Sequence, residues 1–145
     1  CISQDAVLAS LSSILGILTL VVAGIASISL GVAGIGIMNV MLVSVSERTD
    51  EVGLLKALGA NQRQILQIFL LEATMLSSAG GLIGLASGTA LVGLGNLLYP
   101  RIDAATPLWA IAAVLGLSLG TGIVFGVLPA WRASRLDPVA ALQGH

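Results

Sequence analysis

Few side chains in this 145-residue sequence could take part in catalysis or hold a metal ion. The one histidine, His145, is the last residue, and the one cysteine, Cys1, is the first. Gly31, Gly34 and Gly36 superficially resemble a phosphate-binding loop, but no Lys-Ser or Lys-Thr pair follows them. We therefore predict that the chain is not an enzyme and has no catalytic residues, metal site or cofactor of its own.

The carboxylates also argue against ion transport through this chain. Proton carriers usually need an acidic residue in the middle of a membrane helix. Glu72 stands instead at the edge of an apolar run, where a charge at a helix end is the more ordinary interpretation. An ion-conducting bundle is thus disfavoured, and a flux assay on the reconstituted protein would test it.

The composition is that of a membrane protein. Hydrophobic residues make up 57% of the chain and charged residues 9%, whereas a soluble domain is about 25% charged. No basic stripe is present that could follow the phosphates of a nucleic acid. Three runs without any charge, residues 6–46, 73–100 and 104–131, each exceed the roughly 20 residues that cross a bilayer. The sequence predicts a single all-α membrane domain, residues 1–145, with three transmembrane helices in contact with lipid.

The first charge-free run is too long for one membrane crossing. As a helix it would measure roughly 60 Å, against a hydrocarbon core of about 30 Å. A hairpin is the alternative, but the run has no Pro or Asp that would mark a turn. We predict one long helix, in which residues 1–19 form a stalk outside the membrane and residues 20–45 cross it. Apolar residues spaced by three and four would form a seam for a second helix, unless the spacing is chance: Leu8, Leu11, Leu15, Leu18, Val22 and Ile25.

The positions of Lys and Arg predict the orientation. The other two spans are expected at residues 70–99 and 107–131. Five of the basic residues follow the first or the third span, and only Arg101 lies between the second and third spans: Arg48, Lys56, Arg63, Arg132 and Arg135. The positive-inside rule then predicts an external N-terminus, a cytoplasmic segment at 46–61 and a cytoplasmic tail at 132–145.

Small residues recur at intervals of four in the predicted spans. This spacing lets two helix backbones approach closely. The candidate packing residues are Ala23, Ser27 and Gly31 in the first span, and Gly80, Gly84 and Gly88 in the second. The third span has the pairs Gly116–Gly120 and Gly122–Gly126. The contact could form within the chain or across a dimer. In the third span, Pro129 is expected to kink or end the helix.

The largest polar stretch is residues 46–61, SERTDEVGLLKALGAN. Thr49 or Asp50 could cap a short helix, and Gly59 suits the left-handed position that ends one. Asn61 with Gln64 resembles the capping box of a following helix. Val52, Leu54, Leu55 and Leu58 would supply an apolar face. We predict a short amphipathic helix that docks on a cytoplasmic partner; the alternative is a solvated connector that only fixes the topology.

Two stretches resemble a known family. They are residues 34–60, GIGIMNVMLVSVSERTDEVGLLKALGA, and residues 125–142, FGVLPAWRASRLDPVAAL. Both are similar to FtsX-like permeases of ABC transporters, of the macrolide-exporter (MacB) type. The resemblance implies part of a larger, dimeric protein of the bacterial inner membrane, with four spans and a large external domain. ATP and Mg²⁺ would bind to a nucleotide-binding domain or subunit outside this chain.

The resemblance also implies a role for the polar stretch as a coupling segment docked on the ATPase. The residues that match the family pattern are Glu47, Arg48, Thr49, Glu51, Gly53, Lys56, Gly59 and Ala60. Leu55 stands where the family often has a basic residue, which would weaken one polar contact. Such permeases are expected to transmit ATP-driven motion to the external side for export. The alternative is a regulator that activates a cell-wall hydrolase or sensor kinase, or extracts lipoproteins; a periplasmic adaptor or substrate protein could also bind.

Overall fold

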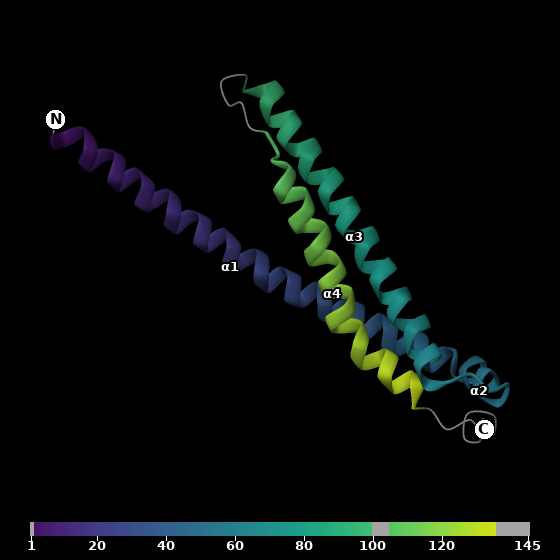
Figure 1. Cartoon of the computed structure of the whole chain (residues 1–145). Helices are drawn as coiled ribbons and strands as arrows, with labels where there is room; N and C mark the ends of the chain where they lie inside the picture. Colours follow the sequence, from purple (N-terminus) through teal and green to yellow (C-terminus); the bar gives the residue numbers. More distant parts are fainter. Residues whose placement is uncertain (1, 100–104, 136–145) are drawn as a thin grey trace. The chain divides into compact units, whose positions relative to one another are not determined.

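The computed structural model describes residues 2–99 and 105–135, and all regular structure in these ranges is α-helical. The helices are α1 (Ile2–Glu47), α2 (Thr49–Ala57), α3 (Gln62–Leu98) and α4 (Leu108–Ser134) (Figure 1). Three of them, α1, α3 and α4, are long and apolar enough to cross a membrane. The predicted all-α fold with three candidate spans is thereby confirmed. Cys1, Arg101, His145 and most of the predicted tail lie outside the described residues.

The first apolar run forms one continuous helix, α1, of 46 residues. At about 1.5 Å per residue such a helix is about 70 Å long, roughly twice the hydrocarbon thickness. The alternative of a hairpin is therefore wrong, in line with the absence of Pro and Asp from the run. Packing divides the chain into two units, Cys1–Ala33 and Gly34–His145. In the first unit, the predicted seam residues from Leu8 to Ile25 are exposed in the single chain, so a second helix on that seam stays a prediction.

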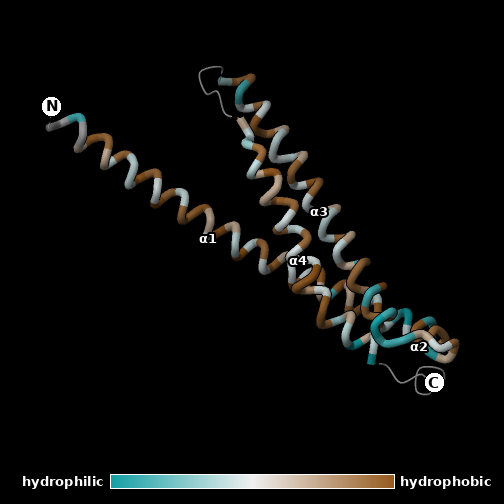
Figure 2. Tube along the Cα trace, viewed as in Figure 1, coloured by the Kyte–Doolittle hydropathy of each residue, from teal (hydrophilic) through white to brown (hydrophobic). Residues whose placement is uncertain are grey.

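In the second unit, α3 and α4 pack against each other as an antiparallel hairpin (Figure 1). The contacting residues are small and recur every four positions: Ala73, Ser77 and Gly81 on α3, and Ser118, Gly122 and Gly126 on α4. Ser77 Oγ donates a hydrogen bond to Ser118 O. A Cβ atom added to Gly122 would lie 2.8 Å from Thr74 Cα. The two backbones therefore approach as closely as small residues allow, and both helices are largely apolar along their length (Figure 2).

The glycines predicted for packing on α3 lie on a different face of that helix. Outside the local helix, no atom lies within 4 Å of the Cβ position at Gly31, Gly80, Gly84 or Gly88. Ala23 and Ser27 are exposed, and Ser27 Oγ donates to Ala23 O of its own helix at 2.8 Å. In the described part of the second unit, Gly122 and Gly126 of α4 make a close helix contact, whereas Gly80, Gly84 and Gly88 of α3 make none. Packing of these residues across a dimer stays a prediction.

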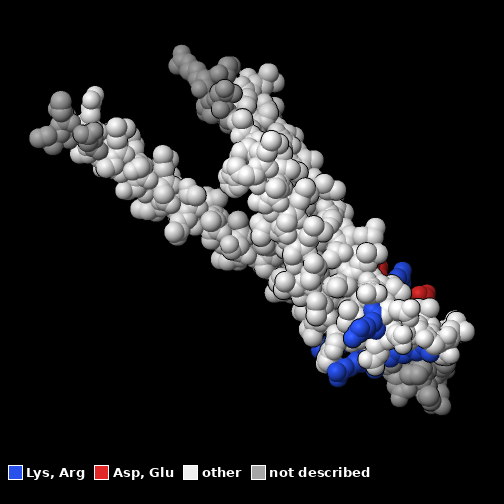
Figure 3. Space-filling model, viewed as in Figure 1, with Lys and Arg blue, Asp and Glu red and all other residues white. Residues whose placement is uncertain are grey.

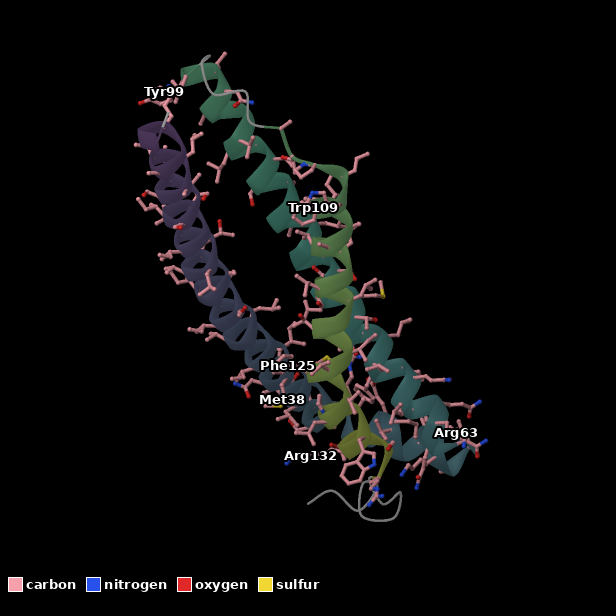
Figure 4. The ribbon with its side chains drawn as sticks, turned by 60° about the vertical axis from the view of Figure 1, so that its left-hand side comes forward. Met38, Arg63, Tyr99, Trp109, Phe125 and Arg132 are labelled. Atoms are coloured by element: carbon pink, nitrogen blue, oxygen red, sulfur yellow. The ribbon has the colours of Figure 1, made fainter. Side chains whose placement is uncertain are left out.

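An apolar core lies at the end of the second unit that includes α2. Its buried members come from all four helices: Met41, Val45, Val52, Ile65, Phe69, Ala73, Ala130 and Ala133. About two turns before Met41 in α1, Gly34 lies against the ring of Phe125. This ring projects from α4 towards the part of α1 that carries Met38 (Figure 4). The core therefore fixes the last turns of α1 to the α3–α4 hairpin.

Pro129 does not end the third span. The helix α4 continues through this residue to Ser134, beyond the expected end at residue 131. A proline inside a helix removes one backbone hydrogen bond, but Pro129 is fully buried and lies near the end of α4. Burial of its ring offsets the lost hydrogen bond; of the two predicted effects, termination of the helix is therefore wrong, and a kink at Pro129 stays a prediction.

Candidate functional site

A single residue, Arg48, separates α1 from α2. Its backbone angles, φ −104° and ψ 22°, depart from those of a helix. Even so, Arg48 N–H donates to Ser44 O at 3.1 Å, and Arg48 O accepts Val52 N–H at 3.0 Å. The backbone hydrogen bonds thus continue through the joint although Arg48 itself is not helical.

The prediction that Thr49 or Asp50 caps α2 was consequently wrong. Arg48 occupies the cap position, and no side chain makes a capping hydrogen bond there. The hydroxyl of Thr49 points back instead and donates to Ser46 O at 2.9 Å. Thr49 therefore bonds to the end of α1, and the start of α2 has no capping side chain.

The other end of α2 closes at Gly59, as predicted. Gly59 has φ +95°, which glycine adopts without the steric cost that other residues have. Its N–H donates to Lys56 O at 3.0 Å, and Ala60 N–H donates to Leu55 O at 2.9 Å. These two bonds form a Schellman motif, which satisfies carbonyls at the end of the helix.

The next helix begins within two residues of this turn. The capping box predicted from Asn61 and Gln64 forms, with Asn61 N–H donating to Gln64 Oε1 at 2.9 Å. Helix α3 starts at Gln62, as expected. The direction of α2 is therefore set at both ends, by the Arg48 joint and by the Gly59 turn.

Helix α2 buries one side and exposes the opposite one. Val52 and Gly53 are buried in the second unit, at 2% exposure for Val52. On the opposite side Leu54, Leu55 and Leu58 are exposed by 55%, 40% and 78%. Together with exposed Glu51 they follow the spacing i, i+3, i+4 and i+7, which is one face of a helix. We call Glu51, Leu54, Leu55 and Leu58 the α2 stripe.

Charged residues lie at the same end of the second unit as the stripe. Figure 3 shows the Lys, Arg, Asp and Glu side chains gathered at the α2 end of the second unit, and Arg63 and Arg132 reach this same end (Figure 4). Glu47 and Asp50 are exposed, whereas Lys56 is half-buried. In the described ranges, no three His, Cys, Asp or Glu residues gather as metal ligands would. The arrangement offers a binding surface, with apolar area to bury and charges beside it to orient a partner.

An ion pair joins the Arg48 joint to α3. Arg48 Nη1 lies 3.5 Å from Glu72 Oε2, and the two side chains are 50% and 40% exposed. Sequence reasoning assigned Arg48 to the partner and Glu72 to a helix end, and it missed this pair. The position of Glu72 could have indicated the pair. It is a lone carboxylate at the start of an apolar run, and a charge near the membrane is usually paired with an opposite charge.

The joint, the Gly59 turn and the α2 stripe all lie in a stretch that matches a known family. Residues 23–138 match the family described as FtsX-like permease C-terminal. The chain belongs to the FtsX-like permeases. Its resemblance to this family, inferred above from residues 34–60 and 125–142, is thus confirmed. This membership and the three apolar helices fit a multi-pass protein of the bacterial inner membrane.

Known relatives of this FtsX-like permease have export functions in their names. The chain is 48% identical over 142 residues to a macrolide export ATP-binding/permease protein MacB of Rhodopseudomonas palustris, covering 98% of this chain and 22% of that relative. It is 51% identical over 128 residues to a pyoverdine export ATP-binding/permease protein PvdT of Pseudomonas fluorescens, covering 88% and 19%. The chain spans about a fifth of the length of these curated relatives.

In this FtsX-like permease the predicted coupling residues do not form one surface. Glu51 belongs to the exposed stripe, and Glu47 is exposed one turn before it. Thr49, Gly53 and Lys56 lie on the inner half of α2, where they are buried or half-buried. Arg48 pairs with α3, and Gly59 and Ala60 form the turn. The structure thus separates residues that face outward from residues that shape and hold the segment.

The Gly59 turn of the permease allows a direct test. Replacing Gly59 with alanine is expected to destabilise the turn by about 1–2 kcal/mol, the cost of a left-handed backbone for an L-residue. No atom lies within 4 Å of the new Cβ, so the cost comes from the backbone alone. Gly59→Asn should be milder, because Asn tolerates positive φ better. Thermal unfolding in detergent micelles, followed by circular dichroism, compares the variants; equal losses for Ala and Asn would contradict this account.

Proposed function

We propose that this chain is the C-terminal membrane portion of an ABC-type export permease, which couples cytoplasmic ATP hydrolysis to work across the membrane. The names of its relatives, ATP-binding/permease proteins for export, support this function. In the proposed arrangement residues 1–19 form an external stalk, residues 20–45, 70–99 and 107–131 cross the bilayer, and residues 132–145 are cytoplasmic. Two copies form a dimer, and ATP with Mg²⁺ binds to a separate nucleotide-binding domain or subunit.

The observation that carries the proposal is the α2 stripe. Three neighbouring leucines stand exposed on the side of α2 that points away from the apolar core. Burying a leucine side chain is worth about 1.5–3 kcal/mol, and a helix with an apolar face commonly docks in a groove of a partner. The partner proposed here is the nucleotide-binding domain, because α2 lies at the basic end of the second unit, the cytoplasmic end by the positive-inside rule.

The joint at Arg48 supports transmission of force as the mechanism. Hydrogen bonds run from α1 into α2 without a loop, so a displacement of α2 acts directly on the end of α1. A long helix with intact backbone bonds resists bending, which suits it to carry that displacement towards the external side. A regulator that switches an external partner would use the same transmission, and only the identity of that partner separates it from an exporter.

Photo-crosslinking from the α2 stripe tests the proposed docking. In the full-length protein in membranes, p-benzoylphenylalanine at Leu58 is expected to crosslink to the nucleotide-binding domain, because Leu58 is the most exposed leucine of the stripe. The matched position is Leu117, exposed in the middle of α4, which should crosslink to lipid alone. Mass spectrometry of the digested protein identifies both products. Crosslinking of Leu58 to lipid alone would mean that the stripe lies on the bilayer.

Substitutions then separate the contributions within the segment. Leu54→Ala combined with a crosslinker at Leu58 should lower the yield several-fold, since a neighbouring contact of the stripe is lost. Glu51→Ala with Lys56→Ala is expected to uncouple ATP hydrolysis from export while the protein still inserts, with Glu51 responsible for most of the effect. Gln62→Ala, exposed at the start of α3 and outside the stripe, is the control. Unchanged export per ATP in the Glu51→Ala, Lys56→Ala variant would argue against docking through this segment.

A further inference from the structure

The side chain of Arg48 reaches from the α1–α2 joint to a different helix. Arg48 is the one residue between α1 and α2, and its Nη1 atom lies 3.5 Å from Oε2 of Glu72 in α3. Glu47 and Asp50 are carboxylates next to Arg48 in sequence, so Glu72 competes with two local acids for the guanidinium. The pair that forms is nevertheless the one that spans two helices.

The pair adds a side-chain constraint at the joint, where the backbone hydrogen bonds and a small buried contact are the other restraints on α2. The helix has only nine residues, too few to be stable without tertiary contacts. On its inner side Val52 and Gly53 are the buried residues. A rotation about the backbone of Arg48 would change the angle between α2 and α1, and besides the backbone hydrogen bonds only this small buried contact would oppose it. The Arg48–Glu72 pair lies at the pivot itself, where a short bridge restricts the angle of the whole segment.

We propose that Arg48 and Glu72 form a positioning pair that locks the α1–α2 joint to α3. The lock makes α2, the end of α1 and α3 move as one body when α2 is displaced. This inference rests on the proposed function, since it assigns a mechanical role to the segment that docks. It gives Arg48 a contact within the chain in place of the predicted contact with the ATPase.

The expected effect of breaking the pair is on the position of α2 and not on folding. Both side chains are about half exposed, and ion pairs of that exposure contribute little to overall stability. The apolar core beneath the joint remains intact in such a variant. Loss of the pair should therefore leave the unfolding temperature nearly unchanged while the orientation of α2 becomes variable.

Distances between two spin labels test the lock. The full chain is placed in lipid nanodiscs with Cys1→Ser, and labels are attached at Leu58→Cys, directly after α2, and at Gln67→Cys on α3, both exposed positions. Double electron–electron resonance then gives the distribution of their separation. We expect Arg48→Glu and Glu72→Arg each to widen that distribution at least twofold. The exchanged variant, Arg48→Glu with Glu72→Arg, should return it to the original width.

Controls make the outcome specific. Arg63→Glu reverses a basic residue at the same end of the bundle and is expected to leave the distribution unchanged. Glu72→Gln removes only the charge and is measured alongside in case a reversed charge prevents folding. Unchanged widths in the single variants, or no recovery in the exchanged one, overturn the proposal. The Leu58 crosslink tests docking separately. Failure of the positioning pair would leave the spin-label widths unchanged, whereas failure of the proposed function would remove the crosslink to the nucleotide-binding domain.

Discussion

Replacing Gly122 with alanine is expected to force α3 and α4 apart and to lower the free energy of unfolding by about 1–3 kcal/mol, the usual cost of overpacking. The new Cβ would lie 2.8 Å from Thr74 Cα, 2.9 Å from Ser77 Cβ and 3.0 Å from Ala73 O. Two of these three atoms belong to the backbone, which cannot turn away as a flexible side chain can. The helices must separate or slide, and the hydrogen bond from Ser77 to Ser118 O is then lost as well.

The control for this substitution lies two residues away on the same helix. Gly120 has no atom within 4 Å of its Cβ position outside the local helix, so Gly120→Ala adds the same methyl group without a collision. It should keep or slightly raise stability, because alanine is the better helix former. Unfolding by titration with SDS, followed by circular dichroism, measures both variants. A loss of stability as large in Gly120→Ala as in Gly122→Ala would show that the close approach at Gly122 is not what matters.

Features set by composition and by local backbone chemistry were predictable from the sequence. Charge-free runs of sufficient length identified the three apolar helices, and the absence of Pro and Asp between 6 and 46 identified α1 as a single helix. The positive φ of Gly59 and the start of α3 after Asn61 depend on residues next to each other in the chain. Such signals need no knowledge of the tertiary structure.

Features that depend on a neighbouring helix were not predictable in the same way. Small residues spaced by four occur on two adjacent faces of α3, through Gly80 and through Gly81, and only the position of α4 selects the second. The cap at Thr49 failed because its hydroxyl bonds to a carbonyl at the end of α1, and the pairing of Arg48 with Glu72 joins the α1–α2 joint to α3. The direction of the stripe on α2 likewise follows from which side the core occupies.

Cysteine labelling is expected to place Ser10 and Leu58 on opposite sides of the membrane. In a background with Cys1→Ser, a membrane-impermeant maleimide should label Ser10→Cys in cells whose outer membrane is permeable to the reagent. It should label Leu58→Cys only after the inner membrane is opened. Both positions are exposed in the structure, so a difference in labelling reports the side of the bilayer and not burial. In intact inner membranes we expect nearly complete labelling of Ser10→Cys and almost no labelling of Leu58→Cys.

The physical basis of this prediction is the length of α1. A helix of 46 residues, about 70 Å long, cannot be contained in a hydrocarbon core of about 30 Å, so one of its ends must project into water. The polar residues that follow Ser46 hold the α2 end at one surface, which leaves the N-terminal half to cross and emerge. Thr106→Cys, in the second connection, should label together with Ser10→Cys. Labelling of Ser10 from the same side as Leu58 would mean that α1 does not cross the membrane, and motion of α2 would then have no path to the external side.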